Sequence, residues 1–261
     1  ASLISSSSIT LSGSYYLYGL TLQSATSILP ANQSASNSVT LDHCSLITTG
    51  TTGGGFFSIG SANNITQKAV LLGCTYKFGG VANVGLSCAG TVEIKGGSFI
   101  SGTSTPSAGV FGGAASDRTG SRLTIDGLDM TNLASTVNIF RTFISPGLFQ
   151  IRNSKLPASW SGSLCNAVPL STGQRFEMHN CDSGDTNYRL WVQEYSGSIK
   201  TETTLVRTGG ASDGTTGYSF KMATSANANA LVAPLVSPEI VIWNADVGSS
   251  KTVTFEILHD S

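Results

Sequence analysis

The stretch SRLTIDGLDMT, from Ser121 to Thr131, shows the pattern that recurs along the whole chain. Apolar Leu123 and Ile125 alternate with polar residues, as in a strand, and Gly127 follows where a bend is expected. One such stretch is only a strand that runs into a bend, but seven in succession predict the rungs of a coil. The other six are ITLSGSYYL (9–17), VTLDHCSLI (39–47), AVLLGCTYKF (69–78), VEIKGGSFI (92–100), FQIRNSKL (149–156) and FEMHNCDS (176–183).

The central apolar residue of each stretch serves as an anchor for measuring the repeat. Successive anchors are 30, 30, 23, 31, 26 and 27 residues apart. A period that drifts within roughly 20 to 50 residues is typical of a solenoid whose loops absorb insertions. The anchors are Leu11, Leu41, Leu71, Ile94, Ile125, Ile151 and Met178.

Positions around the anchor predict where each side chain points. The residue two before the anchor lies on the same face of the strand, so both are expected in the core. The residue two after it is mostly Gly or Asn, which tolerate a left-handed backbone, so the chain is expected to turn there. The fifth residue after the anchor is expected to point inward again. The corners are Gly13, His43, Gly73, Gly96, Gly127, Asn153 and Asn180, and the later inward row is Tyr16, Leu46, Tyr76, Phe99, Met130, Leu156 and Ser183.

A third apolar segment follows most anchors after 12 to 16 residues, so each rung is expected to contain three short strands. The pattern predicts an all-β fold, a parallel β-helix of about seven rungs, because no useful helical periodicity competes with it. These third segments are GGFFSIG (54–60), VGLSCAG (84–90), GVFGGAA (109–115), VNIFRTFI (137–144), LCNAV (164–168) and YRLWVQEY (188–195).

The repeat stops after about residue 196. We therefore predict two domains, a parallel β-helix over 1–197 and a small antiparallel, β-sandwich-like domain over 198–261 that caps the solenoid or mediates oligomerisation. The strands expected in the second domain are IKTETTLVR (199–207), GYSFKMAT (217–224), EIVIWNA (239–245) and KTVTFEIL (251–258).

Composition argues against several classes of partner. Charged residues make up 11% of the chain and the formal net charge is -1, which argues against binding to nucleic acid or to an anionic membrane surface. No apolar stretch is long enough to insert into a membrane. The five cysteines are an odd number in a long chain, so we expect reduced thiols in the core rather than a disulfide framework. No residue spacing predicts a metal site, and no motif predicts a cofactor.

The outward face of the first strand holds the candidate catalytic residues. Lys95, Asp126, Arg152 and His179 take equivalent positions on successive rungs, so the simplest expectation is a ladder of cross-rung ion pairs. The alternative is a catalytic pair, Glu93 and Asp126, whose backbones we place about 8 Å apart, a separation compatible with inverting glycoside hydrolysis. Against catalysis, the flanking cations would keep Asp126 ionised, and the expected outward rows contain no aromatic residue for sugar stacking.

The segment DSGDTNYRLWVQEY (182–195) is the densest polar stretch in the chain. It contains acids beside aromatic residues, a mixture that could bind a glycan or a cation, although a solvated loop before the last strand would explain it as well. The candidate ligand-binding residues are Asp182, Asp185, Tyr188, Trp191 and Glu194.

The rungs from Ile9 to Tyr195 resemble the right-handed parallel β-helix of pectate-lyase-like enzymes and bacteriophage tailspikes. The chain departs from the calcium-binding pectate lyases, because its outward rows never place acids on adjacent rungs of one row. The run SPEIVIWNADVGSSKTVTFEI (237–257) resembles the ends of some phage virion proteins. This resemblance implies a homotrimeric virion component that is assembled in the host cytoplasm, and it carries over no catalytic residue.

Three functions are therefore expected from the sequence. The first is a non-enzymatic structural or attachment protein of a phage particle, as a tail fibre, tailspike-like protein or capsid decoration protein that contacts other virion proteins and a host cell-surface glycan. The second is a tailspike depolymerase that cleaves host polysaccharide as a glycoside hydrolase or polysaccharide lyase. The third is a secreted bacterial adhesin of solenoid type, which would need an export signal upstream of Ala1.

Overall fold

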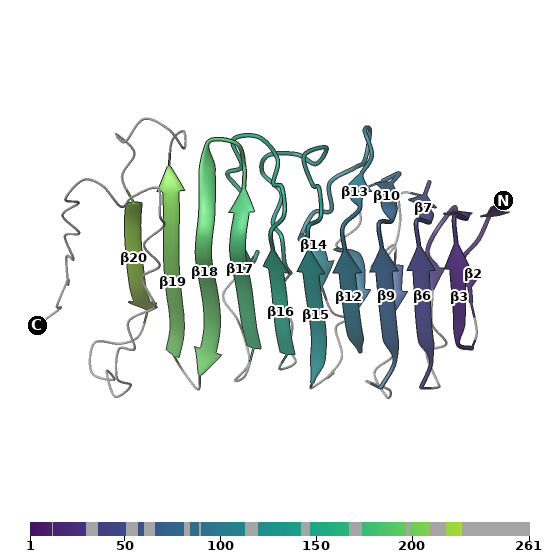
Figure 1. The fold of residues 1–261 in the computed structure, drawn as a ribbon, viewed down its shortest axis with the longest axis horizontal. Helices are drawn as coiled ribbons and strands as arrows, with labels where there is room; N and C mark the ends of the chain where they lie inside the picture. Colours follow the sequence, from purple (N-terminus) through teal and green to yellow (C-terminus); the bar gives the residue numbers. More distant parts are fainter. Residues whose placement is uncertain are drawn as a thin grey trace, which may run out of the picture. The chain divides into compact units, whose positions relative to one another are not determined.

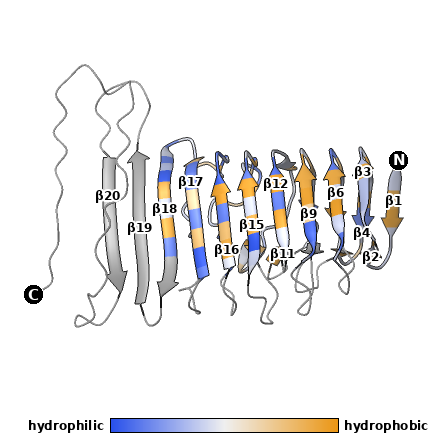
Figure 2. Cartoon of the chain, turned by 60° about the horizontal axis from the view of Figure 1, so that its bottom comes forward, coloured by the Kyte–Doolittle hydropathy of each residue, from blue (hydrophilic) through white to orange (hydrophobic). Residues whose placement is uncertain are grey.

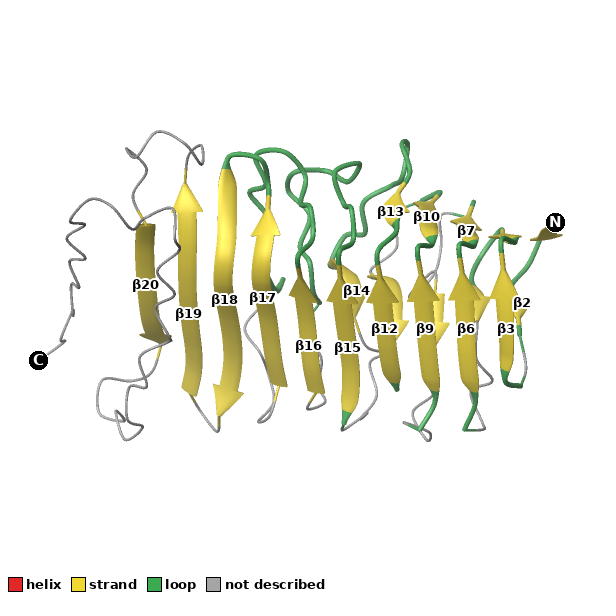
Figure 3. Cartoon of the chain, in the orientation of Figure 1, coloured by secondary structure: helices red, strands yellow, loops and turns green. Residues whose placement is uncertain are grey.

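A computed structural model describes residues 1–11, 13–29, 36–50, 57–59, 66–80, 84–88, 90–112, 120–141, 147–166, 174–196, 199–208 and 218–225. These residues form strands, turns and loops, without a helix (Figure 3). Accordingly, none of the described elements is a helix long and apolar enough to cross a membrane. The all-β fold class predicted from the repeat is confirmed.

Each of the first five coils of the chain contributes one strand to each of three sheets (Figure 1). The first sheet contains β1 (Ser2–Ser5), β4 (Thr21–Ser24), β7 (Ser45–Thr48), β10 (Thr75–Phe78) and β13 (Ser98–Phe99). The second contains β2 (Ile9–Thr10), β5 (Ile28–Leu29), β8 (Phe57–Ile59), β11 (Val84–Cys88) and β14 (Gly109–Gly112). The third, which we call the long sheet, begins with β3 (Tyr15–Tyr18), β6 (Ser38–Asp42), β9 (Lys68–Leu72), β12 (Thr91–Lys95), β15 (Ser121–Asp126), β16 (Gly147–Arg152) and β17 (Gln174–Asp182).

All strand pairs within these coils are parallel, so the predicted parallel β-solenoid is confirmed. The number of rungs was overestimated, because the first and second sheets have five strands each and thus make about five turns rather than seven. Within the part of the chain that the structure describes, those two sides continue beyond β13 and β14 as isolated bridges, such as Phe140 to Cys165 and Lys155 to Asp182.

The register of the long sheet confirms six of the seven anchors. Leu41, Leu71, Ile94, Ile125, Ile151 and Met178 pair in succession from β6 to β17. All six side chains are almost fully buried. Spacing alone thus identified the inward row of this sheet.

The first anchor was wrong. Leu17, not Leu11, pairs with Leu41, and the preceding residues Ile9 and Thr10 form β2 in the second sheet. Both candidate segments have an apolar residue followed two positions later by Gly, as Leu11 has Gly13 and Leu17 has Gly19, so the pattern alone could not separate them. Tyr16 was consequently placed in the core, whereas its side chain lies on the surface with 60% exposure.

A left-handed residue follows the long-sheet strand in six rungs and lies within β17, as Asn180, in the seventh. The backbone φ values run from 49° to 72° at Gly19, His43, Gly73, Gly96, Gly127, Asn153 and Asn180. Each of the first six corner residues donates its amide N–H to the carbonyl of a residue in the next rung, at 2.7 to 3.0 Å. The bends therefore turn the chain and also join neighbouring rungs.

The interior is a continuous column of side chains with an aromatic centre. Phe149 and Phe176 stack with their ring centres 5.7 Å apart, and Phe140 contacts both. The row after the corner holds small residues, including Cys44, Cys74 and Cys181. All five cysteines are buried and free, as expected, and burial raises the pKa of Cys74 to about 11 and that of Cys181 to about 12.

After β17 the chain reverses direction. The antiparallel strands β18 (Thr186–Ser196) and β19 (Ile199–Thr208) extend the long sheet, which also includes β20 (Tyr218–Ser225). The expectation that residues 188–195 form a third strand of a rung was wrong, because they lie in β18 beside β17.

The chain forms two compact units, Ala1–Thr224 and Ser225–Ser261. The domain boundary predicted at residue 197 stays a prediction, although β18 and β19 pair along most of their length across it. The predicted strands at 239–245 and 251–258, and the resemblance at 237–257, lie outside the described residues.

The corner geometry predicts an unequal response to substitution at Gly127. An added Cβ would meet only Gly96 atoms at 3.9 Å, so there is room for it, and the cost is the left-handed backbone alone. We expect Gly127→Ala to lower the free energy of unfolding by about 1–2 kcal/mol, and Gly127→Asn to cost clearly less, because Asn fills the same corner at positions 153 and 180. Equilibrium urea unfolding measures both. If Gly127→Ala and Gly127→Asn lower the free energy of unfolding equally, the left-handed backbone is not the cause of the loss.

Candidate functional site

The outward face of the long sheet gathers most of the chain's described charged side chains. An open depression on this face is lined by Lys68, Thr91, Glu93, Ile94, Lys95, Arg122, Thr124, Asp126, Gln150 and Arg152. Because successive rungs are in register, these residues come from β9, β12, β15 and β16, which are distant in sequence. Both candidate catalytic acids, Glu93 and Asp126, lie in it.

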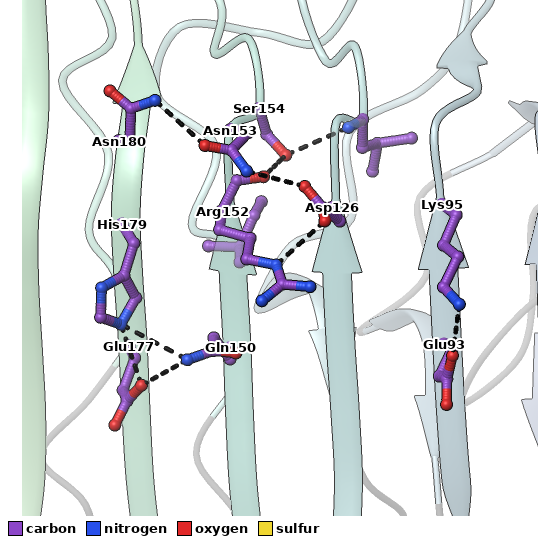
Figure 4. Close-up of polar contacts among 12 residues, drawn as sticks. Glu93, Lys95, Asp126, Gln150, Arg152, Asn153, Ser154, Glu177, His179 and Asn180 are labelled. Carbon is purple, nitrogen blue, oxygen red and sulfur yellow. Dashed lines mark hydrogen bonds and ion pairs between the residues drawn. The ribbon is translucent and has the colours of Figure 1, made fainter.

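Glu93 is neutralised within its own strand. Its Oε2 lies 2.9 Å from Lys95 Nζ, two residues away on the same side of β12 (Figure 4). The hydrogen bond from Lys95 lowers the pKa of Glu93, so this carboxyl group is ionised at neutral pH. An acid with a lowered pKa is a poor proton donor, and this weighs against Glu93 as a general acid.

Asp126 is held from the next rung. Arg152 Nε donates to its Oδ2 at 3.0 Å, and Asn153 Nδ2 donates to its Oδ1 at 2.9 Å (Figure 4). Both carboxylate oxygens therefore have a partner. The register pairs Glu93 with Thr124 and Lys95 with Asp126, so the two acids are one rung and two residues apart, as expected.

The predicted ladder of cross-rung ion pairs forms at only one step. Asp126 pairs with Arg152 across rungs, whereas Lys95 and His179 each bind an acid of their own strand. Long side chains can reach neighbours at i+2 as easily as neighbours on the next rung, so equivalent positions alone do not determine the partner.

Glu177 is the centre of the densest polar cluster on this face, and sequence reasoning did not single it out. Its side chain is only 10% exposed. His179 Nε2 donates to Oε2 at 2.9 Å, Gln150 Nε2 donates to the same oxygen at 2.7 Å, and Arg175 Nε donates to Oε1. These donors, His179 foremost, outweigh burial and lower the pKa of Glu177 to about 2. The alternation Arg-x-Glu-x-His was the available signal, because it puts three ionisable residues on one side of a strand.

A separate chain of side-chain hydrogen bonds runs from Asp126 to Arg189 of β18. Asn180 Nδ2 donates to Asn153 Oδ1 at 3.0 Å, and Arg189 Nη1 donates to Asn180 Oδ1 at 2.8 Å. Since Asn153 also binds Asp126, hydrogen bonds link the side chains of Asp126, Asn153 and Asn180 (Figure 4). Arg189 extends this link to β18. Both carboxylate oxygens of Asp126 and the amide oxygens of Asn153 and Asn180 accept hydrogen bonds in this network, which suits a stable surface more than a proton-transfer site.

The predicted ligand-binding segment is divided between a turn and the core. Asp182 Oδ1 accepts the amide of Gly184 at 2.8 Å, and Asp185 Oδ1 accepts the hydroxyl of Ser183 at 2.9 Å, so both acids stabilise the turn between β17 and β18. Glu194 lies opposite Arg175 in the antiparallel register. Its role as a ligand-binding residue stays a prediction, like that of the two aspartates.

The aromatic members of that segment cover the end of the core. Tyr188 and Trp191 stack with their ring centres 5.8 Å apart, and Trp160 contacts both. Tyr188 and Trp191 pack against the buried cluster and are only partly exposed. Most of their ring surface therefore contacts protein, and the geometry supports a plug for the core as their role.

Two exposed tyrosines on the same sheet were missed. Tyr16 and Tyr18 flank Leu17 and point outward from β3, with exposures of 60% and 65%. The expectation that the outward rows contain no aromatic residue was therefore wrong. The error followed from choosing Leu11 as the first anchor, and only the pairing of Leu17 with Leu41 identifies the correct one.

No group of three or more His, Cys, Asp or Glu side chains placed to hold a metal ion occurs in the described part of the chain. Comparisons with protein-family models, with curated proteins and with solved structures found no match. A functional proposal must therefore start from the residues of this face.

The Glu177 cluster predicts a pH-dependent contribution to stability. The pKa of Glu177 is about 2 in the folded chain against an ordinary value of 4.5, so the ionised group stabilises the fold above about pH 4.5, and the gain is lost as the pH falls toward 2. We expect Glu177→Gln to lower the free energy of unfolding by about 1–3 kcal/mol at pH 6 and by less than half of that at pH 3.

Urea unfolding at the two pH values checks this, and Glu93→Gln is the matched control. Glu93 is 39% exposed and bound by one cation, so its loss should cost no more than about 0.5 kcal/mol. If both variants lose the same free energy at both pH values, the Glu177 cluster has no special role in stability.

Proposed function

We propose that this chain is a non-enzymatic structural or attachment protein of a bacteriophage particle, in which a rigid β-solenoid presents a binding surface. One observation supports it above the others: Glu93, Asp126 and Glu177, the acids along the charged half of the long sheet, are each held by a cation. Acids in ion pairs help to keep a surface ordered, and they are poorly suited to donate protons to a leaving group.

The assignment to a phage particle rests on the resemblance of the rungs to tailspikes and of residues 237–257 to phage virion proteins. We propose a homotrimer, located in the virion after assembly in the host cytoplasm, with other virion proteins and a host cell-surface glycan as partners. Burial of the whole apolar column and hydrogen bonding between rungs support a rod that keeps its shape while bound to a particle.

Light scattering of the purified chain tests the oligomer, with an expected mass of about three times 26.9 kDa. Immunogold labelling of phage particles from the source host tests the location. A monomer that labels no particle would overturn the proposal.

A polysaccharide depolymerase is the second candidate function. The open depression that contains Glu93 and Asp126 favours it, because two carboxylates one rung and two residues apart are compatible with inverting hydrolysis. The third candidate, a secreted adhesin, would share the binding surface and differ in its route of export.

Reducing-end release from host capsule or lipopolysaccharide separates binding from cleavage. We expect no release by the wild-type protein, because the pKa of Glu93 is lowered by Lys95 and both oxygens of Asp126 accept hydrogen bonds. Release that disappears in Glu93→Gln or Asp126→Asn would establish the depolymerase instead. Release that persists undiminished in both variants would place the activity elsewhere on the chain.

A further inference from the structure

The first strand of the long sheet differs from the others in what it presents on the outward face. Tyr16 and Tyr18 in β3 take the positions that Glu93 and Lys95 hold in β12. With 60% and 65% exposure they are, together with Leu3 and Ile4, the large hydrophobic side chains most exposed among the described residues. Two rings at i and i+2 of one strand lie on one side of the sheet, within reach of a single ligand.

Polar groups of the next rung hold these rings in place. The Tyr16 hydroxyl donates to Asp42 Oδ2, and His43 Nδ1 lies 2.5 Å from Asp42 Oδ1. The His43 ring in turn lies against Tyr18, with ring centres 5.9 Å apart and planes tilted by 55°. We call Tyr16, Tyr18, Asp42 and His43 the tyrosine cluster.

The surroundings of the tyrosine cluster differ from the charged half of the face. On the following rung β9 presents Val70 and Leu72, which pair with Thr40 and Asp42. Strand β9 is hydrophobic after its first residue, as Figure 2 shows. The face thus begins with aromatic and aliphatic side chains around one carboxylate and continues into the ion-paired region of β12 to β17.

We propose that the tyrosine cluster is a binding subsite for a neutral saccharide. One face of a pyranose ring presents C–H groups, which stack on the negative face of an aromatic ring, while its hydroxyls need acceptors and donors nearby. The tyrosine cluster supplies two exposed aromatic rings for stacking, and a carboxylate and an imidazole for hydrogen bonds to the hydroxyls. Tyrosines whose rings are already held lose little conformational entropy on binding.

The charge of the cluster selects among saccharides. Hydrogen bonds from Tyr16 and His43 lower the pKa of Asp42, so the carboxylate is negative at neutral pH, accepts sugar hydroxyls and repels uronic acids. A small organic cation fits less well, because a flat, open face does not enclose it as an aromatic cage does. The inference deepens the proposed attachment function by naming the ligand class, and it rests on that function for its biological meaning.

Saturation-transfer NMR with cellohexaose, maltohexaose and hexa-N-acetylchitohexaose tests the proposal on the full chain, with hexagalacturonic acid and choline as comparisons. We expect at least one neutral hexaose to receive saturation on its ring C–H protons, and the two charged probes to receive none. No signal from any of the three neutral hexaoses would overturn the inference, and a stronger signal from hexagalacturonic acid or choline would overturn the choice of ligand class.

Variants then locate the binding. Tyr16→Ala and Tyr18→Ala should each raise the dissociation constant at least about tenfold, whereas Tyr18→Phe should change it less than about threefold, because the ring remains. Lys155→Ala, outside the long sheet, is the control and should leave binding unchanged. Thermal unfolding followed by circular dichroism confirms that each variant is folded.

Two further outcomes of these experiments would contradict the inference. If the alanine variants bind the hexaose as tightly as the wild type, the cluster is not the subsite. If they instead reduce the mass measured by light scattering, the cluster is a contact between copies of this chain and the inference fails. In that case, or if no hexaose binds, labelling of phage particles would still support the attachment function, so the two proposals can fail separately.

Discussion

The left-handed corner that follows the parallel strands β3 to β16 of the long sheet, and recurs within β17, is the constraint on which the solenoid depends. It turns the chain so that the next strand can begin, and its amide bonds to the following rung, so one residue sets both the bend and the stacking. Only Gly, Asn and His occupy it, which agrees with the steric cost of this conformation for most L residues. This column of corners keeps the strands of the long sheet, and the side chains on them, in register.

The alignment explains why inward and outward rows have such different chemistry. Inward positions of neighbouring rungs hold similar residues, such as the stacked phenylalanines of β16 and β17. Each inward side chain has to fill the space next to the equivalent side chain of the adjacent rung. Outward positions have no such requirement, so they vary from tyrosine through valine to glutamate along one row. Function therefore has to be sought in the outward rows, where one rung can change without disturbing its neighbours.

Sequence reasoning predicted the inward rows and corners well, because both follow from local pattern. It failed at the first rung, where two overlapping segments satisfied the same pattern and only pairing with Leu41 distinguishes Leu17 from Leu11. It also failed to predict which charged side chains pair. Lys95 forms its ion pair with Glu93 in its own strand and not with Asp126 on the neighbouring rung. Register fixes where a long side chain starts, whereas its rotamer decides where the charge lies.

The solenoid changes its cross-section along its length. In the first five coils each turn adds a strand to three sheets, whereas among the described residues after β14 the long sheet alone continues as strands and the other two sides are joined by isolated bridges. The later coils therefore depend more on the apolar column, in which Phe140, Phe149 and Phe176 contact one another. A fold that begins as three ladders thus continues as one ladder against a packed interior.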